Sequence, residues 1–203
     1  MNRKLFGERF ALLIALAVLS AFGCAKKIPG EPEKTVERYA KAVQAGEYST
    51  IFEINALSAR QLKHLRQSTG EEAEKTIAQT MERFQQAYNE APATFQPGIS
   101  WAEKGYFPAG AQVTVGRAYW PEKVGDDPVN ADYEKFANCY VPVDVDYTGA
   151  KKIPEQDGKK VKSAHYDCSL KKIREGRNVT IYSHDDVWYF GGCIVAVGKI
   201  TYQ

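Results

Sequence analysis

The chain has 203 residues, of which 44% are hydrophobic, 26% are charged and 12% are aromatic. This composition is typical of one globular domain and excludes the collagen-like, coiled-coil and intrinsically disordered classes. Residues 1–23 hold three of the 27 basic and one of the 25 acidic residues, so the rest of the chain has 24 of each sign. Because nucleic-acid binding relies on an excess of basic residues, we expect no nucleic-acid partner.

The first 23 residues are typical of an export signal. Arg3, Lys4 and Arg9 precede an uncharged apolar run at residues 11–22. A helix of that length is roughly 18 Å long, which is short of the roughly 30 Å hydrocarbon core of a bilayer. The pattern therefore predicts a signal peptide over residues 1–23 rather than a transmembrane span.

The sequence Ala21-Phe22-Gly23-Cys24 resembles the lipobox of bacterial lipoproteins, in which a lipidated cysteine follows a small residue. The resemblance implies that Cys24 carries two or three acyl chains, which anchor a protein stably in a membrane. It also implies the outer membrane, facing the periplasm, because Ala25 rather than aspartate follows the cysteine. We expect residues 24–31 to form a short tether. The alternative is a secretory signal cleaved elsewhere, with Cys24 as an ordinary thiol.

Helical signals fill the first third of the chain after the tether. Apolar residues recur at helical spacing between Pro32, which suits a first helical turn, and Gly46, which suits a helix end. A capping-box sequence at residues 68–71 opens a later helix that Pro92 ends. We predict four helices, at residues 32–45, 48–52, 57–65 and 68–91.

From residue 94 onward the pattern changes to strands, since apolar and polar residues alternate between clusters of glycine and proline. Pro142 lies inside one of these strands, which predicts an edge position or a bulge there. Helices followed by antiparallel strands indicate an α+β fold, with N-terminal helices packed on an antiparallel sheet in a single domain over residues 32–203. The strands are predicted at residues 113–119, 140–147, 164–171, 179–181 and 187–197.

Three cysteines follow Cys24. A hairpin loop centred between Ile153 and Pro154 places Cys139 opposite Cys168, on matching faces of two antiparallel strands. Export to an oxidising compartment favours a disulfide between them. Cys193 is then the odd thiol, buried on the face of the last strand that carries Val195 and Val197. The alternative is three reduced cysteines in the core.

No phosphate-binding loop, nucleophile elbow or pair of metal ligands is recognisable, so we predict no catalytic motif, metal or cofactor. Asp144 and Asp146 alternate on one strand face, and His165 lies on a neighbouring face. They would suit acid–base chemistry if that face lined a pocket, whereas the simpler interpretation is the solvated side of a strand. Tyr119 and Trp120 suit a pocket wall, although aromatic residues more commonly fill the core.

The run from Pro32 to Tyr39, the Gly46-Glu47-Tyr48 sequence and the late Asp186-Val187-Trp188-Tyr189 sequence resemble exported lipoproteins of the cystatin-like cone fold. Nuclear transport factor two and ketosteroid isomerase share this fold. The resemblance implies a curved antiparallel sheet that wraps a long helix and leaves a cone-shaped cavity. In the enzymes of the fold that cavity holds an acid or a base, but none of those groups maps onto a numbered residue here.

We therefore expect an envelope lipoprotein that acts as a non-enzymatic binding or interaction domain. Its partners would be the membrane, through the lipid anchor, and an envelope protein or a small molecule. The alternative is an isomerase-like or hydratase-like enzyme in which Asp144, Asp146 or His165 reaches into the cone. The two hypotheses differ in whether ionisable groups converge inside an open cavity.

Overall fold

We describe the fold from a computed structural model of the chain, which covers residues 28–66, 70–90, 106–120, 138–172 and 187–203. The signal peptide, Cys24 and most of the expected tether lie outside these ranges, and so does the strand predicted at residues 179–181. The described chain has four helices followed by five strands, so the predicted α+β fold is confirmed.

The four helices lie close to their predicted positions. The first, α2 (Pro32–Ala45), begins with the expected proline and ends at Gly46. Gly46 has φ 70°, a left-handed conformation that glycine adopts without strain, and the next amide donates a hydrogen bond back to the Ala42 carbonyl oxygen. The others are α3 (Tyr48–Ile54), α4 (Ala56–Arg66) and α5 (Glu71–Glu90).

The strands form one antiparallel sheet. In this sheet β1 pairs with β2 and β2 pairs with β4, while β4 also pairs with β3 and with β5. The sheet bends and twists along the two long strands β4 and β5, which carry three register shifts between them. The strand bounds are β1 (Gln112–Val115), β2 (Asn138–Asp146), β3 (Glu155–Gln156), β4 (Lys159–Lys171) and β5 (Tyr189–Tyr202).

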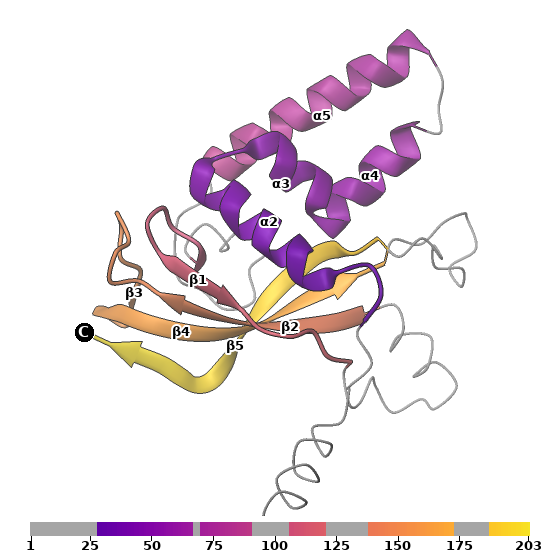
Figure 1. The fold of residues 1–203 in the computed structure, drawn as a ribbon. Helices are drawn as coiled ribbons and strands as arrows, with labels where there is room; N and C mark the ends of the chain where they lie inside the picture. Colours follow the sequence, from indigo (N-terminus) through magenta and orange to yellow (C-terminus); the bar gives the residue numbers. More distant parts are fainter. Residues whose placement is uncertain (1–27, 67–69, 91–105, 121–137, 173–186) are drawn as a thin grey trace, which may run out of the picture.

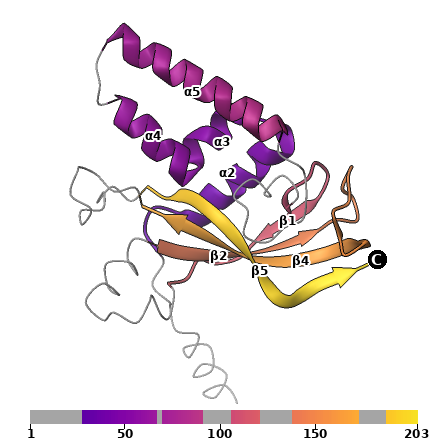
Figure 2. The ribbon, with the colours of Figure 1, turned by 180° about the vertical axis from the view of Figure 1, so that it is seen from behind.

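Helix α2 lies across one face of the sheet. Helices α3, α4 and α5 lie on the same side of the sheet, beyond α2 (Figures 1 and 2). The apolar stripe of α2 packs against β1, β2 and β5, and the buried positions of β2 and β4 alternate as predicted with more exposed positions. Tyr39 of α2 stacks on Phe190 of β5 with ring centroids 3.7 Å apart. N-terminal helices therefore pack on a curved sheet, as expected.

Of the two expectations for Pro142, an edge position or a bulge, the edge is wrong, because β2 is an internal strand that pairs with both β1 and β4. The last β1 residue in the ladder is Val115, which pairs with Val143. Pro142 lies just beyond that pair, where the Gly116 amide donates to its carbonyl oxygen at 2.8 Å. Pairing resumes at the Tyr119–Tyr140 bridge with one extra residue on the β1 side, so Pro142 lies opposite a bulge, where an internal proline is tolerated.

The predicted Cys139–Cys168 disulfide is wrong. Cys139 lies opposite Leu170, and Cys168 lies opposite Val141, so the true register differs from the predicted one by two residues. The connection from β2 to β4 contains the short strand β3, and the tight turn joins β3 to β4 at two residues that both have positive φ, as a type I′ hairpin turn requires. These turn residues are Asp157 and Gly158.

The disulfide joins Cys168 to Cys193, which lie directly opposite each other on β4 and β5. Cys193 is therefore not the odd thiol. Cys139 is the free cysteine among the described residues, and it is fully buried on the same face of the sheet. Burial raises the pKa of the Cys139 thiol, because the thiolate would lose its hydration.

Candidate functional site

Asp144, Asp146 and His165 come together on the sheet face that points away from the helices. Asp144 and His165 are cross-strand partners, and Asp144 Oδ1 lies 2.7 Å from His165 Nδ1. The Asp144 side chain is 71% exposed and that of His165 is 18% exposed. Together with Lys199 the three residues border an open depression of about 490 Å³. Their position matches the solvated side of a strand and not a cavity between the helices and the sheet.

The Asp146 side chain is hydrogen-bonded within a local turn. Its Oδ1 accepts a hydrogen bond from the Thr148 amide at 2.8 Å. This hydrogen bond lowers the pKa of Asp146, because it stabilises the ionised carboxylate. A carboxylate held in its charged form is poorly suited to act as a general acid near neutral pH.

Tyr119 and Trp120 do not join that depression. Tyr119 donates a hydrogen bond to Asp167 Oδ1 at 2.9 Å and stacks on Tyr140 with ring centroids 5.8 Å apart. Partial burial and this hydrogen bond raise the pKa of Tyr119 to about 12. Trp120 is half-buried against the core and packs on Trp188. Both aromatic residues stabilise the fold at these positions.

Tyrosines fill part of the space between the helices and the sheet. Tyr147 donates to the Tyr106 carbonyl oxygen at 3.0 Å, and its hydroxyl is also hydrogen-bonded to that of Tyr166. Because the Tyr147 proton goes to the carbonyl, Tyr166 is the donor within the tyrosine pair. Burial raises the pKa of both hydroxyls, so they remain neutral. The buried hydroxyls in this network have hydrogen-bond partners within it, so we assign the network a structural role.

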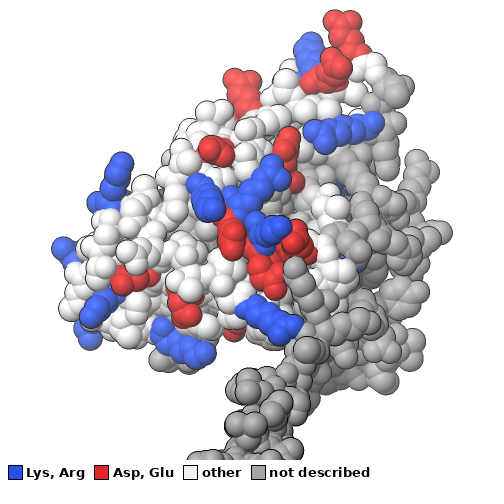
Figure 3. Space-filling view, viewed as in Figure 1, with Lys and Arg blue, Asp and Glu red and all other residues white. Residues whose placement is uncertain are grey.

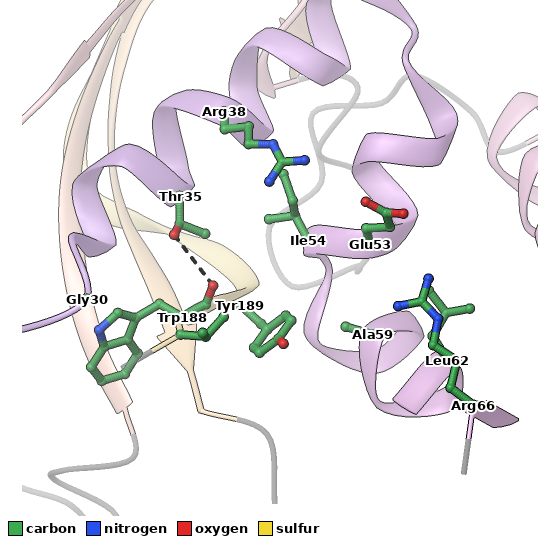
Figure 4. A pocket seen from close by; sticks show the side chains of 11 residues that line it. Gly30, Thr35, Arg38, Glu53, Ile54, Ala59, Leu62, Arg66, Trp188 and Tyr189 are labelled. Carbon is green, nitrogen blue, oxygen red and sulfur yellow. Dashed lines mark hydrogen bonds between the residues drawn. The ribbon is translucent and has the colours of Figure 1, made fainter. Parts of the chain in front are cut away.

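A groove of about 610 Å³ lies outside this core, where the beginning of β5 meets the helices. Figure 4 shows side chains from α2, α3, α4 and the residues around the start of β5 surrounding it. Its volume lies within the roughly 300–1,000 Å³ range of small-molecule sites. The lining residues are Gly30, Thr35, Arg38, Glu53, Ile54, Ala59, Leu62, Arg66, Val187, Trp188 and Tyr189.

Trp188 holds one wall of the groove in place. Its indole Nε1 donates to the Pro29 carbonyl oxygen at 2.7 Å, which ties the start of β5 to the segment before α2. Thr35 of α2 donates more weakly to the Trp188 carbonyl oxygen, at 3.5 Å. On the other side, Asn55 at the α3–α4 corner forms a parallel bridge with Phe190. The groove is thus fixed by contacts between segments more than 130 residues apart.

The charged residues of the groove lie on its rim. Arg38 comes from α2, Glu53 from α3 and Arg66 from α4, and all three side chains are exposed. Within the described ranges none of the three takes part in an ion pair. Elsewhere on the same side of the molecule, basic and acidic side chains are intermixed over α2 (Figure 3). For example, Lys34 Nζ lies 2.7 Å from Glu31 Oε2.

Sequence reasoning missed this groove. Arg38 and Arg66 are far apart in sequence, and each follows the ordinary pattern of a charged residue on the exposed face of a helix. The late Trp188-Tyr189 sequence was singled out only as part of a family resemblance. No local signal brings these positions together, because the groove exists only once β5 returns to the helices.

Comparison of the chain with protein-family models, curated proteins and solved structures finds no match. In the part of the chain that the structure describes, no helix combines the length and the apolar character needed to cross a bilayer. Nor do three His, Cys, Asp or Glu side chains gather in an arrangement that could hold a metal ion within those residues. The sequence His184-Asp185-Asp186, interpreted as a solvated turn rather than a metal site, lies outside the described ranges.

Proposed function

We propose that this protein is a lipid-anchored envelope protein that acts as a non-enzymatic binding domain, and that the groove beside β5 is its binding site. The groove itself carries the proposal, because it combines the volume of a ligand site with apolar and charged walls supplied by four separate elements. The resemblance to the lipobox supplies the anchor at Cys24 and the location at the outer membrane, facing the periplasm.

The position of the acidic residues favours binding over catalysis. An acid–base enzyme needs ionisable groups that converge on an enclosed substrate. Asp144, Asp146 and His165 lie on the open outer face of the sheet, and buried tyrosines occupy part of the inner side. In the described structure these three residues are therefore not shielded from water in the way that the isomerase-like alternative requires.

The anchor is tested by replacing Cys24 with serine in the full chain. We expect the variant to move from the membrane fraction to the soluble fraction, because it loses the acyl chains that hold it. Retention in the membrane pellet would contradict the anchor. Mass spectrometry of the native N-terminus should show cleavage before Cys24 and the mass of the attached lipid.

The binding site is tested with a groove-filling variant, Thr35→Trp, and a matched substitution on the same helix, Ala45→Trp. Thr35 lines the groove, whereas Ala45 is exposed at the end of α2. Native mass spectrometry of protein purified from the cell envelope should detect a bound molecule, chemically unaltered, in the unmodified chain and in Ala45→Trp. The bound molecule should be missing from Thr35→Trp. Equal occupancy in all three proteins, or no bound molecule in any of them, would contradict the proposal.

A further inference from the structure

The charges on the groove rim favour an anionic ligand. In Figure 4 the guanidinium groups of Arg38 and Arg66 lie on either side of the Glu53 carboxylate. Two cations and one anion leave a single net positive charge at the rim. Guanidinium groups bind carboxylate and phosphate oxygens through charge-assisted hydrogen bonds. A ligand with one oxyanion would complete the charge balance of this rim.

The wall below the rim favours a ligand that also has an apolar part. Ile54, Leu62 and Trp188 line the groove and belong to the hydrophobic core, with at most 5% of each residue exposed. Val187, which is 45% exposed, and the half-buried Tyr189 present apolar surface to the groove in front of these buried side chains. A simple hydrated ion would leave that surface in contact with water, whereas an alkyl chain would cover it.

The groove also lies beside the segment that leads to the proposed anchor. Ile28 is 3% exposed, and the Pro29 carbonyl oxygen is hydrogen-bonded to Trp188 in the groove wall. Four residue steps separate Ile28 from Cys24, which is at most about 14 Å of extended chain. If Cys24 is acylated, the groove is held near the membrane surface, where amphiphilic molecules are concentrated.

From these three observations we propose that the groove binds an anionic amphiphile, a molecule with one carboxylate or phosphate head on an alkyl chain. Arg38 and Arg66 bind the head, and the chain lies along Val187 and Tyr189. Glu53 limits the affinity, because its negative charge on the same rim repels an anionic head. This inference rests on the proposed function of the groove as a binding site, and it names the class of ligand.

Photocrosslinking of the full chain in isolated membranes tests the inference. The probe is a fatty acid with a diazirine in its alkyl chain, and the matched probe is the corresponding fatty alcohol, which has no charge. Peptide mapping should place the fatty-acid label on α4 and on residues 187–190. Below saturation, Arg38→Gln and Arg66→Gln should each reduce this labelling about tenfold. Labelling by the alcohol should not respond to either substitution.

Two further variants separate a charge effect from damage to the fold. Glu53→Gln should increase fatty-acid labelling several-fold, which a damaged groove could not do. Arg60→Gln removes an exposed arginine from α4 that does not line the groove, and it should leave labelling unchanged. Labelling scattered over other peptides, or labelling that is insensitive to Arg38, Arg66 and Glu53, would overturn the inference.

Phosphatidylglycerol vesicles with the same diazirine in the lipid chain distinguish the source of the ligand. Labelling by the free acid alone indicates a soluble amphiphile, and labelling by both probes indicates a membrane lipid. Either result supports an anionic head on an alkyl chain.

The Cys24→Ser variant keeps this test separate from the test of the anchor. Charge-dependent labelling of a variant that stays in the pellet would refute the anchor alone. A soluble variant that is not labelled by the free fatty acid supplied in solution would refute the ligand class alone.

Discussion

Removing the disulfide between β4 and β5 should destabilise the fold substantially. Cys168 and Cys193 are separated by 25 residues in sequence. In the chain-entropy description, a bridge that closes a loop of this length lowers the entropy of the unfolded chain by about 12 cal/mol/K, which corresponds to about 3.5 kcal/mol at 25 °C. The double substitution Cys168→Ala/Cys193→Ala should therefore lower the free energy of unfolding by about that amount.

Urea unfolding, followed by tryptophan fluorescence and far-UV circular dichroism, measures the effect in the Cys24→Ser background. With a urea dependence of about 2 kcal/mol/M, the midpoint should fall by about 1.7 M. Dithiothreitol should produce a similar shift in the parent protein and no further shift in the double variant. The single variant Cys139→Ala is the control, because it should keep its sensitivity to dithiothreitol.

Two results would refute this reasoning. One is a urea midpoint that dithiothreitol leaves unchanged in the parent protein. The other is a non-reducing peptide map that links Cys139 to Cys168, because Cys139 lies opposite Leu170 in the sheet. That map would also require the register of β2 and β4 to shift by two residues.

Three further predictions concern local contacts. Gly110→Ala should lower the free energy of unfolding by more than about 2 kcal/mol, because Gly110 has φ +87° and a Cβ there would lie 2.4 Å from the Gly149 carbonyl oxygen. Gly158→Ala should lower it by about 1 kcal/mol, because Gly158 has φ +72° but open space around a Cβ. Equal urea midpoints for the two variants would contradict this. The Cys139 thiol should resist iodoacetamide at pH 8 in the folded protein and react in urea, and rapid native labelling would show that it is accessible. The pKa of Tyr119 in the folded protein is raised from 10.0 to about 12, so its stabilising contribution is complete below pH 10 and is lost as the pH rises toward 12. The difference in free energy of unfolding between the parent protein and Tyr119→Phe should therefore shrink over that window. A constant difference would refute the Tyr119–Asp167 interaction.

Local patterns predicted much of the fold. The run from Pro32 to Gly46 has helical periodicity with a favourable start and stop, and it forms α2. The alternation around Val143 predicted which residues of β2 face the core. Each of these features depends on residues a few positions apart, and for that reason a single sequence was sufficient.

Register could not be predicted in the same way. A shift of two residues leaves every side chain on its original face, so the hydrophobic pattern is equally satisfied by the predicted and the observed pairing. The Asp157-Gly158 turn joins β3 to β4, so the centre of the long loop did not give the register of β2 and β4. Cys168 meets Cys193 through the pairing of β4 with β5, which the assumed loop does not set. The sequence left an edge and a bulge open at Pro142 for a related reason, because the choice depends on how the neighbouring strand pairs.

The sequence by itself determined the order of helices and strands, the faces that those strands bury and the balance of charge. Only the tertiary structure decided the disulfide, the exposure of Asp144 and His165 on the outer face, and the groove that joins Arg38 to Arg66. Periodicity records how each segment divides its residues between core and solvent. It carries no information about which distant segments meet, because many pairings satisfy the same pattern and packing selects one of them.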